Sequence, residues 1–227
     1  MSMFFQQLFD EETCTYTYVL ADDKKEALLI DPVLECIDQY TACLDTHQLQ
    51  LKYVLDTHIH ADHITAADAL RQRTGCQTAI SSHAAVTCAD IELSDGMRLI
   101  CGGLEVHVLE TPGHTPTCLS FLCENMVFTG DALLIDGCGR TDFQGGDAGV
   151  LYESITQKLF VLPASTRVYP GHDYHGKLNS TIGAEKQHNP RLQHTKLEFI
   201  ALMDQLNLPN PKRMHEAVPA NQACGKI

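Results

Sequence analysis

Thr57-His58-Ile59-His60-Ala61-Asp62-His63 places three histidines and one aspartate within seven positions. A short apolar run, residues 53–55, precedes this stretch, and a run of helix-forming residues, 64–73, comes after it. This order predicts a strand, a polar loop and a helix. Side chains two positions apart in an extended segment point to the same side, so His58 and His60 are expected to face one point. The other two polar residues would enter from the following turn, which is typical of a metal-binding loop.

The length and charge of the chain limit its domain organisation and its partners. A chain of 227 residues with 44% hydrophobic content predicts a single domain over residues 1–227. A formal net charge of −13 disfavours nucleic acid and anionic membranes as partners. Apolar runs long enough to span a membrane are missing from the sequence. Residues 1–10 contain no basic region, so we expect neither a secretory signal nor a transit peptide, and a cytoplasmic location.

Ten cysteines are scattered through the chain at irregular intervals, and none forms a Cys-x-x-Cys pair. So many thiols would be hazardous in an oxidising compartment, so we expect free thiols in a reducing cytosol. Cys138 is expected to be a small buried side chain. For Cys224 we expect no particular role.

The order of predicted elements favours two mixed sheets with helices on their outer faces. Strands are expected at residues 4–9, 15–20, 27–30, 53–55, 78–80, 97–100, 104–109, 117–122, 126–129 and 167–169. Helices are expected at residues 34–49, 64–73, 151–160 and 182–206, the last broken at Asn189-Pro190, and the tail is expected to be a Pro-rich loop. Neither an all-β pattern nor strict βαβ alternation fits this order.

Three further ligand-type residues each follow the end of a predicted strand. His114 and His172 follow Pro-Gly turns, and Asp131 follows the strand at 126–129 across one glycine. Proline and glycine set particular backbone angles, which suits side chains that must be held in a fixed place. Together with the 57–63 stretch they predict one site that contains seven ligand-type residues.

These motifs resemble those of the metallo-β-lactamase superfamily: His-x-His-x-Asp-His at 58–63, Pro-Gly-His at 112–114, Thr-Gly-Asp at 129–131 and Pro-Gly-His-Asp at 170–173. The resemblance implies an α+β fold, a four-layer αββα sandwich with the metal site at the strand ends. In the two-zinc hydrolases of this superfamily, residues of the His58, His60 and His114 type bind one metal. Residues of the Asp62, His63 and His172 type bind the other, with Asp131 bridging. All seven positions are filled, so a two-metal hydroxyacylglutathione hydrolase of the glyoxalase II type remains an alternative.

The loop at 137–144, Gly-Cys-Gly-Arg-Thr-Asp-Phe-Gln, resembles the signature of the persulfide dioxygenases, and segments 171–176, 189–192, 206–209 and 217–221 resemble that family too. The resemblance implies one Fe(II) per chain, bound by His58, His114 and Asp131 type residues. It also implies oxidation of glutathione persulfide by dioxygen and water to sulfite and glutathione, and a homodimer. The remaining four ligand-type residues, His60, Asp62, His63 and His172, would orient the ligands and accept protons, or form a vestigial second metal site.

Glutathione carries two carboxylates that the overall charge repels, so a local cation is needed. Arg140 is the first choice, because a guanidinium can bind a carboxylate through two parallel hydrogen bonds. The Tyr174 hydroxyl and Arg213 are further candidates for substrate binding. A non-catalytic metal-binding module on the same fold is a third interpretation, and a superfamily nuclease is disfavoured by the lack of a basic surface.

Overall fold

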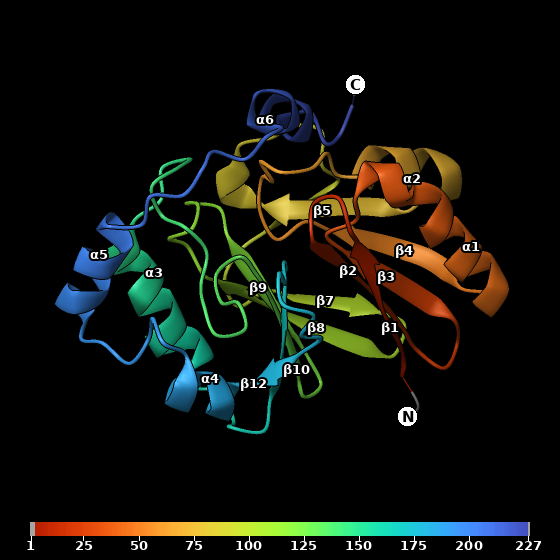
Figure 1. Cartoon of the computed structure of the whole chain (residues 1–227). Coiled ribbons are helices and arrows are strands. Elements are labelled where there is room, and N and C mark those ends of the chain that lie inside the picture. Colours follow the sequence, from red (N-terminus) through yellow and green to blue (C-terminus); the bar gives the residue numbers. More distant parts are fainter. Residues whose placement is uncertain (1–2, 227) are drawn as a thin grey trace.

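The computed structural model describes residues 3–226, and within that range two mixed six-stranded sheets pack face to face (Figure 1). Helices α1 and α2 cover the outer face of one sheet, and α3, α4 and α5 lie on the far side of the other. The predicted α+β αββα sandwich is therefore confirmed. Among the described residues, no helix is long and apolar enough to cross a membrane.

The first sheet has the order β1-β2-β3-β4-β5-β6, with β1, β2 and β3 antiparallel and β3 to β6 parallel. Its strands are β1 (Phe4–Asp10), β2 (Thr15–Ala21), β3 (Glu26–Ile30), β4 (Gln50–Leu55), β5 (Gln77–Ser81) and β6 (Ile91–Leu93). Because β3 and β4 are parallel, the residues that come after them, including the 57–63 loop, emerge at one edge of the sheet.

The second sheet has the order β12-β11-β10-β9-β8-β7, and its only parallel pair is β10 with β11 within the described residues. Its strands are β7 (Arg98–Cys101), β8 (Leu104–Glu110), β9 (Leu119–Cys123), β10 (Met126–Gly130), β11 (Arg167–Pro170) and β12 (Ser180–Thr181). Alternating side chains of both sheets form a buried aromatic and aliphatic core between the layers, including Tyr18, Leu55, Phe121, Phe128 and Tyr169.

The helices follow local sequence signals. They are α1 (Ile37–His47), α2 (Ala67–Thr74), α3 (Ala148–Ser154), α4 (Ile182–His188), α5 (Lys196–Asp204) and α6 (Met214–Gln222). Asp147 and Thr181 cap α3 and α4 through their side chains, and Thr195 with Glu198 forms a capping box on α5. Gly75, with φ of +73°, ends α2 where the sequence predicts.

Two short strands, β6 and β12, were not predicted, and several predicted elements have other bounds in the structure. The helix expected from residue 64 begins only at Ala67, because the Ala66 amide donates to the Pro32 carbonyl across the sheet edge. The tail expected to be a loop contains α6, with Pro219 inside the helix. A strap, residues 205–213, runs from α5 to α6, which lies at the top of the molecule in Figure 1.

The cysteine prediction is wrong at two positions. Cys88 and Cys224, which are 136 residues apart, form a disulfide, so Cys224 does have a structural role. The other eight cysteines are free thiols, and all ten lie within the described residues. Cys138 is buried, as expected.

Candidate metal centre

Four strands from the two sheets deliver the ligand-type residues to one edge of the sandwich. The 57–63 loop follows β4, His114 follows β8, Asp131 follows β10 and His172 follows β11. Three backbone hydrogen bonds join the two sides there. Leu119 donates to the Thr57 carbonyl and Tyr16 to the Gly171 carbonyl, each at 2.8 Å, and Asp173 donates to the Cys14 carbonyl at 3.3 Å. The loops are therefore fixed relative to one another by the backbone.

His58, His114 and Asp131 converge into the arrangement that a metal ion needs. One ligand atom from each lies within 4.8 Å of the other two. The His114 Nε2 atom is 3.6 Å from Asp131 Oδ2, and the His58 and His114 rings are perpendicular with centroids 5.0 Å apart. Asp131 Oδ1 is buried without a hydrogen bond to any described residue. A buried carboxylate oxygen that lacks a donor fits a cation at this point.

Hydrogen bonds from Nδ1 leave the Nε2 atoms of His58 and His114 free for metal. His114 Nδ1–H donates to the Arg140 carbonyl at 2.7 Å. The Thr57 hydroxyl donates to Asp31 Oδ2 at 2.8 Å, so it accepts from His58 Nδ1–H at 3.0 Å. Burial and the neighbouring His60 and His114 rings hold the pKa of His58 well below its usual range. The neutral imidazole that metal binding requires is thus favoured.

Glycines at two positions allow the backbone to approach this cluster. A Cβ on Gly139 would lie 2.2 Å from the Asp131 carbonyl oxygen and 2.9 Å from the His114 ring. A Cβ on Gly171 would lie 2.7 Å from Asp131 Oδ1. The Gly-Cys-Gly-Arg loop can therefore bring the Arg140 carbonyl to His114 only because residue 139 has no side chain.

His60, Asp62 and His63 form a second cluster beside the first. Their ligand atoms also lie within 4.8 Å of one another. His63 Nδ1 is 2.8 Å from Asp62 Oδ2, and His60 Nε2 is 3.2 Å from Asp31 Oδ1. His60 Nδ1 and His63 Nε2 are buried and have no described hydrogen-bond partner. These two free nitrogens suit water molecules or a second cation.

His172 connects the two clusters. Its Nε2 atom is 3.6 Å from Asp62 Oδ2 and 3.5 Å from Asp131 Oδ1. Burial opposes ionisation of Asp62, but His63 and His172 hold the pKa of that carboxyl well below its usual range. Burial acts to lower the pKa of His172, but the Asp131 and Asp62 carboxylates raise it above its usual value. All seven predicted ligand-type residues are therefore brought together.

The three predicted substrate-binding residues have different surroundings in the structure. The Tyr174 ring lies parallel to His172 with centroids 6.0 Å apart, and it is 65% exposed at the mouth of the site. The Arg140 guanidinium binds both Asp142 oxygens and the Leu208 and Pro209 carbonyls.

Arg213 forms ion pairs with Glu35 and Glu216. Neither it nor the guanidinium of Arg140 contacts a metal-type side chain among the described residues.

Two further residues contact the ligand-type residues or their loop, and their roles were not predicted from the sequence. Asp31 accepts hydrogen bonds from the Thr57 amide and hydroxyl and pairs with His60. Asn221 binds backbone carbonyls of residues 57–63, here called the metal-type loop. Asp31 lies next to Pro32, directly after the strand expected at 27–30, where a turn is the ordinary interpretation. Asn221 ends the 217–221 segment that resembles the persulfide dioxygenase family, but its contacts are with backbone groups, so its role could not be predicted from the sequence.

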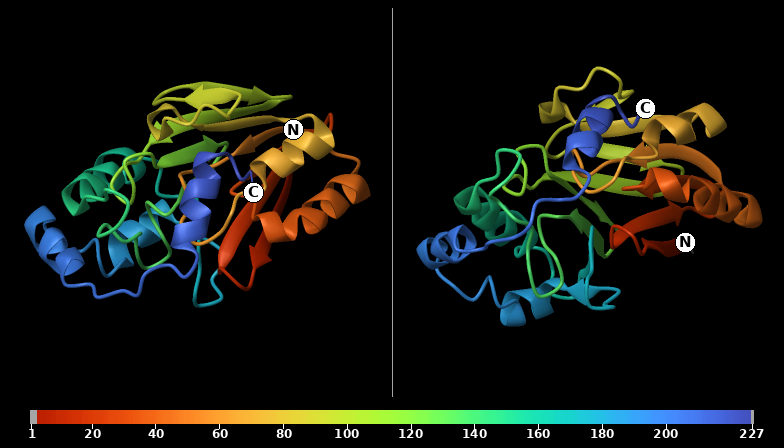
Figure 2. Two further views of the ribbon diagram at one scale, coloured as in Figure 1. Left: turned by 90° about the horizontal axis from the view of Figure 1, so that it is seen from above. Right: turned by 45° about the horizontal axis from the view of Figure 1, so that its top comes forward.

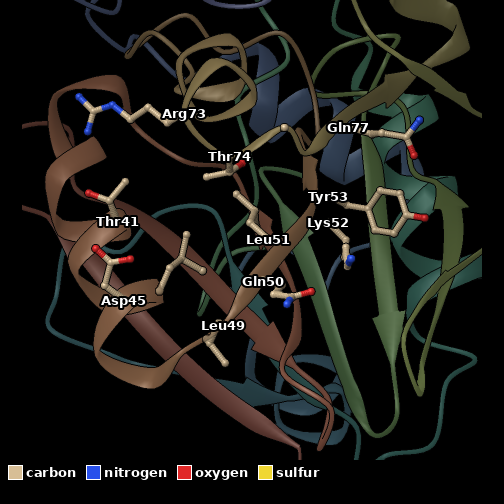
Figure 3. Close-up of a pocket in the computed structure, with 12 residues that line it drawn as sticks. Thr41, Asp45, Leu49, Gln50, Leu51, Lys52, Tyr53, Arg73, Thr74 and Gln77 are labelled. Carbon is tan, nitrogen blue, oxygen red and sulfur yellow. The ribbon is translucent and has the colours of Figure 1, made fainter.

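A pocket of about 600 Å³ opens away from the cluster, between α1, the end of α2 and the start of β4 (Figure 3). Thr41, Asp45, Leu49, Lys52, Tyr53 and Arg73 are among the residues that line it. No predicted site residue does. Because the chemistry-bearing side chains gather elsewhere, we place the functional site at the metal-type clusters.

Comparison with known proteins gives concordant results. The model of the metallo-beta-lactamase superfamily matches residues 13–172. The mitochondrial persulfide dioxygenase ETHE1 of Mus musculus is 46% identical over 224 residues, covering 97% of this chain and 88% of that protein. The crystal structure of ETHE1 from Myxococcus xanthus superposes with a TM-score of 0.96 at 50% identity, covering 98% of this chain and all of that one. A probable metallo-hydrolase of Burkholderia pseudomallei is 31% identical over 99% of this chain and 94% of its own length.

Proposed function

The chain belongs to the metallo-beta-lactamase superfamily and, within it, to the persulfide dioxygenase family, and we propose that it oxidises glutathione persulfide with dioxygen and water to sulfite and glutathione. The observation that carries this proposal is the 46% identity to a persulfide dioxygenase over 97% of the chain. The convergence of His58, His114 and Asp131 supports it independently.

We propose that these three residues bind one Fe(II) per chain. Two histidines and one carboxylate are the ligand set typical of non-haem iron oxygenases, and they leave coordination positions open for substrates. Bound there, iron supplies a redox-active centre, which zinc cannot. The bonds from His58 Nδ1–H to Thr57 and from His114 Nδ1–H to the Arg140 carbonyl orient both rings before the metal binds.

The remaining polar residues would manage protons and substrate. Oxidation of the outer persulfide sulfur to sulfite releases protons, and His172 Nε2 lies between the Asp62 and Asp131 carboxylates, where it can accept and pass on a proton. His60 and His63 would order water through their free nitrogens. Tyr174 lies at the mouth of the site, which supports a contact between its hydroxyl and the glutathione moiety.

We also keep Arg140 and Arg213 as proposed glutathione-binding residues, together with a homodimer and a cytoplasmic location. To bind a glutathione carboxylate, each arginine would have to share its guanidinium with a carboxylate that it already contacts, Asp142 or Glu35. The eight free thiols suit a reducing compartment.

The test is anaerobic purification, measurement of the metal content, and oxygen consumption with glutathione persulfide. We expect about one iron per chain and rapid uptake, both lost in His114→Ala. The matched control is His107→Ala, which removes a half-exposed histidine from β8, the strand that precedes His114, and should keep both the iron and the oxygen uptake.

A two-metal hydroxyacylglutathione hydrolase is the second candidate. The unpartnered His60 Nδ1 and His63 Nε2 atoms favour it, since they could hold a second ion. Two zinc ions per chain, no oxygen uptake and cleavage of lactoylglutathione would replace the dioxygenase proposal with this one.

A further inference from the structure

Asn221 of α6 binds three backbone groups of the metal-type loop. Its side-chain amide donates to the carbonyls of His60 at 2.9 Å and His63 at 2.8 Å, and its carbonyl oxygen accepts from the Thr65 amide at 2.9 Å. The side chain is 3% exposed, so water does not compete for these groups. The loop has no strand or helix of its own over residues 58–63, so Asn221 supplies the hydrogen bonds that secondary structure would otherwise supply.

The rest of α6 holds Asn221 in place through small or partly buried side chains. Ala217 and Ala220 are buried against Ile64, and Val218 is partly buried against the cluster of Ile59, Ile80, Val86 and Cys224. Pro219 lies inside the helix and cannot donate a hydrogen bond to the preceding turn. The strap that leads into α6 is mostly exposed and has no regular structure. The position of Asn221 therefore also depends on the residues that come after it in the chain.

The disulfide begins three residues after Asn221. Cys224 is joined to Cys88, in the segment between β5 and β6. Arg71 of α2 donates to the Cys88 carbonyl at 2.8 Å, and the Asp68 amide of α2 donates to the Cys224 carbonyl at 3.2 Å. Both ends of the disulfide are thus attached to α2, the helix next in the chain after the metal-type loop.

We propose that the Cys88–Cys224 disulfide is a thiol-exchange site that sets how firmly Asn221 holds the metal-type loop, and that glutathione opens it. This inference goes beyond the proposed function and applies whichever metal the site binds. Eight free thiols suit a reducing compartment, where the disulfides that do form are usually transient or redox-sensing.

The exchange proceeds in two balanced steps. Cys88 is partly exposed and Cys224 is 6% exposed, so a glutathione thiolate reaches the Cys88 sulfur first. The Cys88–Cys224 bond breaks, a mixed disulfide forms on Cys88, and Cys224 leaves as a thiolate that takes up a proton. A second glutathione thiolate attacks the mixed disulfide and releases Cys88. The protein gains two electrons and two protons, and two glutathione molecules become one glutathione disulfide.

Opening the disulfide removes the covalent link that keeps Asn221 close to its backbone partners in the loop. Each time α6 separates, the carbonyls of His60 and His63 and the amide of Thr65 lose their protein partner. The loop that carries four of the ligand-type residues is then less well ordered. Partners that orient metal ligands typically change metal affinity by roughly 10- to 100-fold.

The experiment uses the full chain in glutathione and glutathione disulfide mixtures of graded ratio. Hydrogen exchange is measured in a peptide that covers residues 58–67, and release of Fe(II) to a chelator is measured in parallel. We expect both rates to rise roughly tenfold as the disulfide opens. The double variant Cys88→Ala with Cys224→Ala should show the fast rates in every mixture.

Cys14→Ala is the matched control, because Cys14 is a partly exposed cysteine without a disulfide, and this variant should respond like the parent chain. The Asn221→Ala variant should show fast hydrogen exchange in residues 58–67 and fast release of Fe(II) in every mixture, even with the disulfide intact. Equal exchange rates in the oxidised and reduced parent chain would overturn the proposal without recourse to any variant. So would ten reactive thiols, instead of eight, in the unfolded, unreduced protein.

Discussion

Gly139 is a single residue whose missing side chain determines the position of His114, a proposed metal ligand. The Arg140 carbonyl that fixes the His114 ring lies next to it, and the chain passes close to the Asp131 carbonyl oxygen. Any Cβ at this position would displace either ligand. The glycine therefore belongs to the site as much as the side chains that we propose to bind metal.

We predict that Gly139→Ala lowers iron content and turnover by roughly 10- to 100-fold, because the added methyl group forces His114 or Asp131 out of place. Gly137→Ala is the control in the same loop, since a Cβ there meets nothing closer than 4.0 Å. Metal analysis and oxygen uptake measure the effect. Equal losses in the two variants would show that the loop as a whole is sensitive, and that contact with His114 is not the cause.

A second prediction at this scale concerns the Cys36 thiol. Burial and the nearby Asp10 carboxylate, which accepts a hydrogen bond from the thiol at 3.6 Å, raise its pKa to about 11. Only the thiolate reacts, so alkylation by iodoacetamide at pH 8 should be roughly 100-fold slower than for a thiol of pKa 9. The rate should rise about tenfold per pH unit up to pH 10.

Removing the charge tests the cause of this shift. Asp10→Asn should lower the pKa of Cys36 and speed alkylation, whereas Asp38→Asn, which alters an exposed carboxylate on α1, should not. Peptide mass spectrometry gives both rates. A parent chain that already reacts like a free thiol at pH 8 would refute the raised pKa.

Most elements could be predicted from the sequence because their signals are local. Apolar and β-branched runs mark the strands, and Gly75 marks the end of α2. The ligand-type residues were found because four of them lie within six positions and the others come after Pro-Gly or Gly turns. α6 was missed because Pro219 argues against a helix, and its stability comes from contacts distant in the sequence.

The supporting residues of the site could not be predicted for a related reason. Asp31 binds the Thr57 amide across 26 residues, and Asn221 binds the His60 carbonyl across 161. Their partners include backbone groups, which every residue has. A sequence pattern cannot indicate which of them a distant side chain will contact.

The strap is the element whose anchoring can be tested directly. Arg140 binds Asp142 through two parallel hydrogen bonds and also donates to the Leu208 and Pro209 carbonyls. We predict that Arg140→Gln lowers the free energy of unfolding by about 1–3 kcal/mol, since hydrogen bonds from a charged group are lost. Urea unfolding measures this loss.

Arg98→Gln is the control, because Arg98 is 65% exposed and pairs with Glu105 at the surface. Kinetics with glutathione persulfide separate the two roles of Arg140. A raised KM with unchanged stability would favour substrate binding over anchoring of the strap.

At the scale of the whole molecule, the disulfide closes a loop that spans most of the chain. Its cysteines are 136 residues apart. Chain-entropy arguments predict that reduction lowers the free energy of unfolding by about 4–5 kcal/mol. Urea unfolding with and without dithiothreitol measures the loss, and the Cys88→Ala with Cys224→Ala variant should match the reduced parent chain. An unchanged unfolding midpoint after reduction would rule out a stabilising disulfide.

The long reach of Asn221 also has a consequence for biosynthesis. His60 and His63 are synthesised about 160 residues before the side chain that binds their carbonyls, since the separations are 161 and 158 residues. At the usual rate of synthesis of roughly 5–20 residues per second, the nascent loop waits on the order of ten seconds or more for its partner. We therefore predict that the proposed iron is loaded late in the life of each new molecule, and that nascent chains stalled before residue 221 are poor in iron when isolated with their ribosomes.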